Sequence, residues 1–108
     1  MTRGGLIRGG DVVTPDGLRS ATDVRIDDGA ITHVRPRLSS VDAQIIEARG
    51  LLVAPGFIDV HVHGAGGAMC EAGDTDAIDI ISSTLARFGT TGFLASAPWI
   101  RRMLSSTT

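Results

Sequence analysis

The sequence predicts an α/β chain with a small β portion over residues 1–55 and a strand-helix-strand unit over residues 56–108. Up to Pro55, short apolar segments are separated by turn residues, which is typical of a small sheet. After Pro55-Gly56, a buried-type strand is followed by an apolar stripe at helical spacing and then by another strand. The chain has 108 residues, of which 43% are hydrophobic and 20% charged, and this composition is typical of a small globular domain.

The amino-terminal part reads as strands joined by tight turns. Strands are expected at 11–14, 23–27, 30–34, 44–47 and 51–54. Pro15-Asp16-Gly17 is a turn because proline presets φ there, and residues 23–27 alternate charged and apolar side chains. Asp28-Gly29 is a strong signal for a two-residue hairpin turn. We therefore expect a small antiparallel sheet or half of a β-sandwich.

The second part has the pattern of a β-α-β unit. A strand is expected at 57–63, a glycine-rich loop at 64–67, a helix from the N-cap Asp74 through Phe88, and a strand at 92–95. The apolar stripe of this helix consists of Ile78, Ile81, Leu85 and Phe88. Gly89 suits the position after the helix, and another helix can begin at Ile100. Two strands joined in this way should be parallel and connected by a right-handed crossover.

A histidine pair ends the predicted strand at 57–63. Because side chains alternate along a strand, two faces are expected. One carries Phe57, Asp59, His61 and His63, and the other carries the apolar residues Ile58, Val60 and Val62. Functional groups collect at the carboxyl ends of parallel strands. The two histidine Cα atoms should lie roughly 6.5–7 Å apart, so the imidazoles can converge on one metal. Histidine suits Zn²⁺ and similar divalent metals, and the glycines that follow would leave room for a substrate.

Other interpretations of these residues stay open at this point. Two histidines one residue apart on a strand also occur without a metal, and Asp59 is either a partner of one imidazole or a structural acid. Cys70 is expected to be a small buried or loop residue rather than a nucleophile. His33 is expected to be solvated, and Trp99 to serve packing.

Charge and composition exclude several classes of protein. The formal charge of −2 and the pI near 5.8 give no general attraction to nucleic acid or to an anionic membrane. No stretch approaches the roughly 20 apolar residues of a membrane span. A single cysteine and the lack of a signal-peptide pattern in the first ten residues indicate the cytoplasm.

The chain resembles the start of the amidohydrolase superfamily of metal-dependent hydrolases. The matching segments are DVRIDDGAITHV, IIEARGLLVAPGFIDVHVHG and GTTGFLAS, of which the block PGFIDVHVHG is highly specific. The segment HGAGG, followed by a helix and GTTGFLAS, is most similar to the N-acetylglucosamine-6-phosphate deacetylases. Dihydropyrimidinases and nucleobase deaminases share the first block, and the segment APWIRRMLSSTT has no clear counterpart.

This resemblance implies a fold, a site and a reaction. It implies a β-sandwich portion over 1–55 and, over 56–108, the start of a (β/α)8 barrel whose first strand ends in the metal ligands His61 and His63. The reaction implied is metal-dependent deacetylation of a phosphorylated amino sugar, with zinc as the expected metal. Such a barrel takes about 250 residues, so we expect an incomplete barrel that is inactive alone and self-associates through its open edges. There are two alternatives. The chain is a fragment without catalytic activity, or it supplies its histidines to a separate polypeptide that carries the remaining strands.

Overall fold

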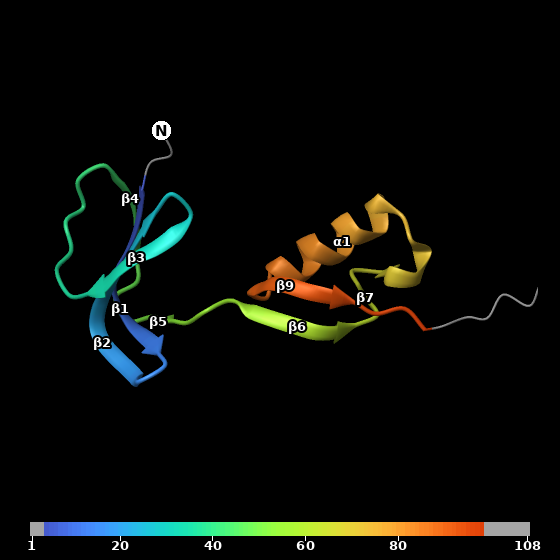
Figure 1. The fold of residues 1–108 in the computed structure, drawn as a ribbon, viewed down its shortest axis with the longest axis horizontal. Coiled ribbons are helices and arrows are strands. Elements are labelled where there is room, and N and C mark those ends of the chain that lie inside the picture. Colours follow the sequence, from blue (N-terminus) through green and yellow to red (C-terminus); the bar gives the residue numbers. More distant parts are fainter. Residues whose placement is uncertain (1–3, 99–108) are drawn as a thin grey trace, which may run out of the picture. The chain divides into compact units, whose positions relative to one another are not determined.

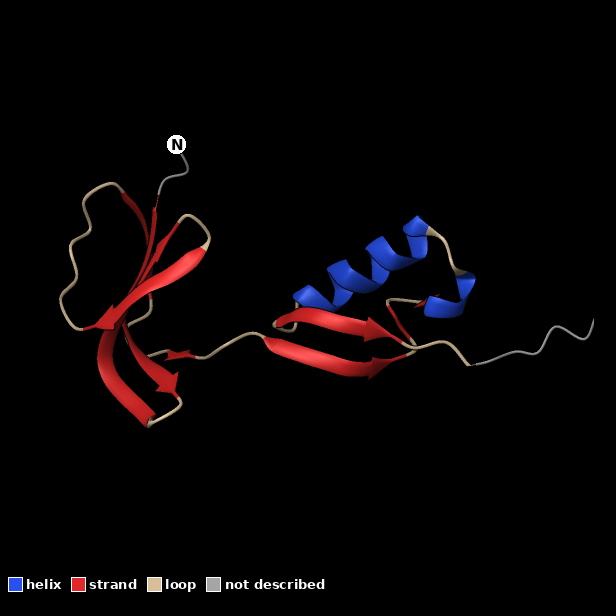
Figure 2. Cartoon of the chain, in the orientation of Figure 1, coloured by secondary structure: helices blue, strands red, loops and turns tan. Residues whose placement is uncertain are grey.

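The computed structural model describes residues 4–98, so Trp99 and the helix expected from Ile100 lie outside the described residues. The chain divides into two compact units, Met1–Pro55 and Gly56–Thr108. Between residues 4 and 98 the chain is mostly β-strand, with one α-helix and one short 3-10 turn (Figures 1 and 2). None of the helices between residues 4 and 98 combines the length and the apolar character that a membrane span requires.

The first unit is one five-stranded sheet with the strand order β3-β2-β1-β4, in which β5 also pairs with β1. The strands are β1 (Gly4–Thr14), β2 (Gly17–Asp27), β3 (Ala30–Arg35), β4 (Ala43–Glu47) and β5 (Leu52–Val53). β1 pairs antiparallel with β2, and β2 with β3, whereas β4 and β5 are parallel to β1. The expected antiparallel pairing is therefore correct for β1, β2 and β3 and wrong for β4 and β5. The β2–β3 hairpin occupies one edge of β1, and the chain returns along the other edge in the direction of β1.

Two features fix the register of this sheet. Asp28 and Gly29 both have positive φ, at 50° and 77°, as a two-residue hairpin turn with right-handed strand twist requires. The buried carboxylate of Asp23 accepts hydrogen bonds from the backbone N–H groups of Gly9 at 2.8 Å and Leu38 at 2.9 Å. Asp23 thereby ties β2 to a bulged part of β1 and to the segment after β3.

The second unit is built on two parallel strands, β6 (Phe57–Val62) and β9 (Thr90–Ala95), as the sequence predicted. Figure 1 shows both arrows running in the same direction, with α1 (Thr75–Ala86) alongside. The predicted N-cap is confirmed, because Asp74 accepts a hydrogen bond from the Ala77 N–H at 2.7 Å. The predicted helix end is wrong by two residues: α1 ends at Ala86, and Phe88 is 76% exposed instead of completing the apolar stripe.

β6 carries a bulge that the sequence did not predict. Asp59 pairs with Phe93 of β9, and Val62 pairs with Ala95. The segment from Asp59 to Val62 is therefore one residue longer than the segment of β9 that it pairs with. An inserted residue interrupts the alternation of side chains between the two faces of a strand. The strict alternation expected over residues 57–63 is therefore wrong, and Asp59 is half-buried whereas both histidines are exposed.

The glycine-rich segment after the histidines forms a small hairpin, β7 (Gly64–Ala65) and β8 (Ala68–Met69), followed by the 3-10 turn Cys70–Ala72. A Cβ atom on Gly66 would collide with the Thr84 side chain of α1, and one on Gly64 would collide with the Ala68 carbonyl. At these two glycines the expected space is therefore filled by the chain itself, whereas nothing lies within 4 Å of the Cβ position of Gly67. The missing side chains of Gly64 and Gly66 let the hairpin pack against itself and against α1.

Candidate metal centre

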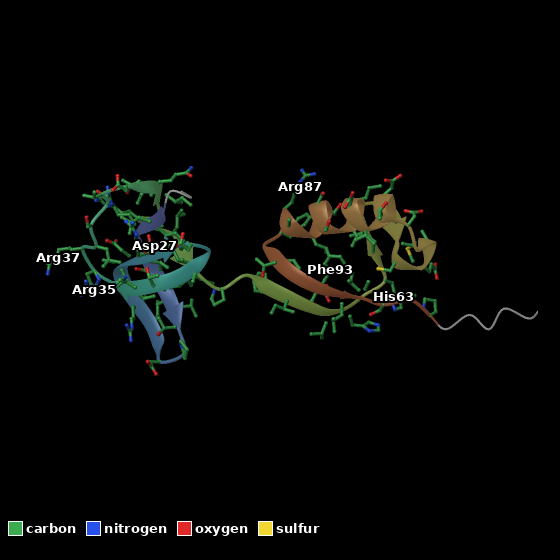
Figure 3. The ribbon with its side chains drawn as sticks, turned by 45° about the horizontal axis from the view of Figure 1, so that its top comes forward. Asp27, Arg35, Arg37, His63, Arg87 and Phe93 are labelled. Atoms are coloured by element: carbon green, nitrogen blue, oxygen red, sulfur yellow. The ribbon has the colours of Figure 1, made fainter. Side chains whose placement is uncertain are left out.

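The two histidines at the end of β6 face one another. The Nε2 atom of His63 lies 3.1 Å from the Nε2 atom of His61, and the rings meet edge to face with their centroids 4.8 Å apart. Both side chains are exposed, and Figure 3 shows His63 where the chain leaves β6. Which of the two nitrogens donates and which accepts depends on the tautomer of each imidazole.

This arrangement fits a divalent metal of the zinc type. Two nitrogens bound to tetrahedral zinc at 2.0–2.1 Å are separated by about 3.3–3.4 Å, close to the spacing of the two Nε2 atoms. The structure therefore brings together the two histidines that the sequence analysis predicted as metal ligands. Among the described residues, no group of three or more histidine, cysteine or acidic side chains could hold a metal ion.

The backbone at the end of β6 is held by Cys70 and Ser96. The Cys70 N–H donates to the His63 carbonyl at 2.7 Å, and its thiol donates to the Val62 carbonyl at 3.3 Å. The Ser96 N–H also donates to the Val62 carbonyl, at 2.9 Å. Cys70 is buried, as expected, but its contacts could not be read from its place in the sequence. Two of these bonds fix the peptide that joins Val62 to His63, and the third fixes the next peptide, which joins His63 to Gly64.

Two side chains reach His61 itself. The Asp59 carboxylate accepts a hydrogen bond from the His61 backbone N–H at 3.0 Å, which is the structural role that the sequence left open for this acid. The Ser96 hydroxyl oxygen lies 3.4 Å from Nδ1 of His61. The sequence analysis did not single out Ser96, although parallel pairing of the two strands brings their carboxyl ends together. His33 lies on β3 in the other unit and is exposed, as expected.

The sequence comparison finds dihydroorotases. No family model matches the chain. Dihydroorotase from Streptococcus thermophilus is 40% identical over 82 residues, which cover 75% of this chain and 18% of the relative. Dihydroorotase from Halalkalibacterium halodurans is 45% identical over 58 residues, covering 54% of this chain and 14% of the relative. The chain thus spans less than a fifth of these curated relatives.

The structure comparison finds deacetylases and other hydrolases. N-acetylglucosamine-6-phosphate deacetylase from Pasteurella multocida has a TM-score of 0.78 at 23% identity, over 88% of this chain and 26% of that one. The deacetylase from Mycobacterium smegmatis has a TM-score of 0.71 at 26% identity, over 87% and 24%. A D-hydantoinase has a TM-score of 0.52 at 31% identity, over 61% and 15%. The fold therefore corresponds to the amino-terminal portion of these larger hydrolases.

Proposed function

Because the chain belongs to the amidohydrolase superfamily and matches its amino-terminal region, we propose that it supplies two metal ligands to a hydrolase of amide-type C–N bonds. The observation that carries this proposal is the 3.1 Å approach of the His61 and His63 Nε2 atoms at the carboxyl end of a parallel strand. In barrels built from parallel strands, catalytic groups lie at that end.

His61 and His63 would hold the metal, for which zinc is the best candidate from the donor set. A divalent metal bound there would polarise a carbonyl group and would make water a better nucleophile at neutral pH. This chain's other residues hold the ligands in place: Asp59, Cys70 and Ser96 fix the backbone on both sides of Val62. In this proposal, the sheet of residues 1–55 is a β-sandwich portion, and residues 56–108 begin a (β/α)8 barrel.

We favour N-acetylglucosamine 6-phosphate as the substrate class, with acetate and the amino sugar phosphate as products. The support is that the two deacetylase structures have TM-scores of 0.78 and 0.71 over 87–88% of this chain, whereas a prolidase has 0.59 over 83% and the D-hydantoinase 0.52 over 61%. The second candidate is the dihydroorotase reaction. It is favoured by the higher sequence identity of 40% over 82 residues.

The metal assignment is tested by titrating the purified chain with Zn²⁺ in a calorimeter. We expect weak binding that is lost in His61→Ala and in His63→Ala but retained in His33→Ala, the matched control on β3. Binding should be weak because a catalytic zinc takes three protein ligands and the described residues bring two together. Tight stoichiometric binding that survives loss of both His61 and His63 would refute the assignment. For the same reason, the 108-residue chain alone should not deacetylate the sugar phosphate.

The substrate is tested by grafting. The matching amino-terminal part of the Pasteurella multocida deacetylase, and separately that of the Streptococcus thermophilus dihydroorotase, is replaced by this chain. Each chimera is paired with a version carrying both His61→Ala and His63→Ala. Histidine-dependent deacetylation by the first chimera alone supports the amino-sugar substrate, and activity of the second alone supports the dihydroorotase reaction. Folded but inactive chimeras would instead favour a catalytically silent chain.

A further inference from the structure

We infer that Ser96 is a positioning residue that sets the tautomer of His61, so that the Nε2 lone pair of His61 faces His63. The effect of Ser96 on metal binding rests on the proposed function, whereas its effect on the tautomer of His61 does not. Ser96 follows directly on β9, and its hydroxyl oxygen lies 3.4 Å from His61 Nδ1, although the residues are 35 positions apart in sequence. The parallel pairing of β6 with β9 brings this hydroxyl to the imidazole.

The neighbours of the hydroxyl group determine the direction of this contact. The Ser96 hydroxyl donates its hydrogen to the Leu94 carbonyl oxygen, which lies 3.4 Å away and can only accept. The lone pairs of the hydroxyl oxygen are then left to accept a hydrogen bond from Nδ1–H of His61. With its proton on Nδ1, His61 keeps an unprotonated Nε2 atom, which is the form that binds a metal through that nitrogen.

His63 must then take the opposite tautomer in the metal-free chain. Its Nε2 atom lies 3.1 Å from that of His61, and one of the two nitrogens has to donate. Because His61 Nε2 is the acceptor, His63 carries its proton on Nε2. Metal binding through both Nε2 atoms therefore requires His63, but not His61, to move its proton to Nδ1. Ser96 thus prepares one of the two ligands in advance.

The backbone of Ser96 is held independently of its hydroxyl group. Its N–H donates to the Val62 carbonyl at 2.9 Å, and this bond does not depend on the side chain. Ser96→Ala should therefore remove the contact with His61 and leave the strand pairing intact. Both side-chain contacts, at 3.4 Å, are longer than an ordinary hydrogen bond, so the effect on metal affinity should lie at the low end of the range for such outer partners, about tenfold.

The test measures the tautomers directly in the metal-free chain. Histidine is labelled with ¹⁵N, and the Nδ1 and Nε2 chemical shifts are read by NMR where the imidazoles are neutral. We expect His61 with its proton on Nδ1 and His63 with its proton on Nε2. Ser96→Ala should convert His61 to a mixture of tautomers, whereas Ser96→Thr keeps a hydroxyl and should preserve Nδ1–H. Ser83→Ala, an exposed serine on α1, is the matched control and should change nothing.

Calorimetric titration with Zn²⁺ provides the second readout. Ser96→Ala should weaken binding about tenfold, and Ser96→Thr and Ser83→Ala should stay within about twofold of the parent. An unchanged His61 tautomer in a folded Ser96→Ala chain would overturn the inference, whether or not zinc binds. A tautomer that responds to Ser96 in a chain that binds no zinc would support the positioning contact and would refute the proposed metal function.

Discussion

The Asp59 carboxylate accepts a hydrogen bond from the backbone N–H of His61 at 3.0 Å, across the extra residue that β6 carries. A bulge disrupts the ladder of backbone hydrogen bonds between strands. Here the Asp59 side chain accepts the hydrogen bond of one backbone donor, the His61 N–H. The bulge and its acid together place His61, the first histidine of the proposed metal site. Asp59 therefore acts on His61 through the backbone and not through the imidazole.

Replacement of Asp59 should separate the role of its acceptor oxygen from that of its charge. Asp59→Ala leaves the His61 N–H without this acceptor and should lower the free energy of unfolding by about 1 kcal/mol. Asp59→Asn retains a carbonyl oxygen and should recover most of that loss. Urea denaturation followed by circular dichroism provides the measurement. Equal losses in the two variants would mean that the negative charge, and not the hydrogen bond, supports the bulge.

The hairpin after the histidines offers a matched pair of glycines. Gly66 and Gly67 have φ of +61° and +84°, so alanine is strained at both, at a cost of about 1 kcal/mol. Only Gly66→Ala also drives a Cβ atom into Thr84, whereas Gly67 has nothing within 4 Å of that position. Gly66→Ala should therefore destabilise the chain by about 1–3 kcal/mol more than Gly67→Ala.

Removal of the Thr84 side chain tests whether that difference comes from the collision. In the double variant Gly66→Ala, Thr84→Ala, the extra cost of Gly66→Ala should largely disappear, which a double-mutant cycle of unfolding free energies measures. Additive effects of the two substitutions would show that the collision with Thr84 is not the cause of the extra cost.

The β2–β3 hairpin contains an acid whose titration should be measurable. A hydrogen bond from the Thr32 hydroxyl at 2.8 Å, and then one from the Arg25 guanidinium at 2.9 Å, hold the pKa of Asp27 below its ordinary value of 3.8. Figure 3 shows Asp27 in this unit. Because the folded-state pKa is the lower one, the stabilisation is present above pH 3.8 and is lost as the pH falls through the folded-state value.

Two substitutions of Thr32 test the cause of this shift. Thr32→Val removes the hydroxyl and should raise the pKa of Asp27 toward 3.8, whereas Thr32→Ser keeps the hydroxyl and should leave the pKa low. The carboxyl ¹³C shift of Asp27, followed by NMR as the pH is lowered, gives the value directly. An unchanged pKa in Thr32→Val would assign the shift to Arg25 instead.

Local pattern was enough to predict α1, β6, β9 and the hairpin turn at Asp28-Gly29, because each depends on residues that are neighbours in sequence. The long strands β1 and β2 were only partly predicted. Glycines at 4, 5, 9 and 10 obscure the alternation in β1, and polar residues do so in the first half of β2. The parallel pairing of β4 with β1 could not be predicted. It depends on which edge of the sheet is free after the β2–β3 hairpin has formed, and the sequence of β4 does not indicate this.

The candidate site, like the fold, could be predicted only in part from the sequence. His61 and His63 could be found because their spacing places both at one strand end. Ser96 and Cys70 could not, because their contacts with His61 and Val62 join residues 35 and eight positions apart in sequence. The bulge at Asp59 was also hidden, since the apolar residues on both sides of it fit a regular strand.

The exposed apolar side chains of β6 lead to a final prediction, which concerns self-association. Ile58 and Val60 are 72% and 68% exposed, and within residues 4–98 β6 has β9 as its one strand neighbour. Apolar side chains beside an unpaired strand edge favour pairing with another chain. The 108-residue chain should therefore form oligomers or aggregates as its concentration rises, which size-exclusion chromatography with light scattering would detect.

The contribution of β6 to this association can be isolated with threonine, which suits a strand but exposes less apolar surface. Ile58→Thr with Val60→Thr should shift the chain toward monomer. Val41→Thr is the control, because Val41 is 70% exposed but lies in the loop before β4. If the parent chain is a monodisperse monomer with strong amide protection along β6 and β9, the strand pair closes without a partner and the prediction fails. If Val41→Thr reduces association as much as the β6 variant, apolar exposure in general, and not the open edge, causes it.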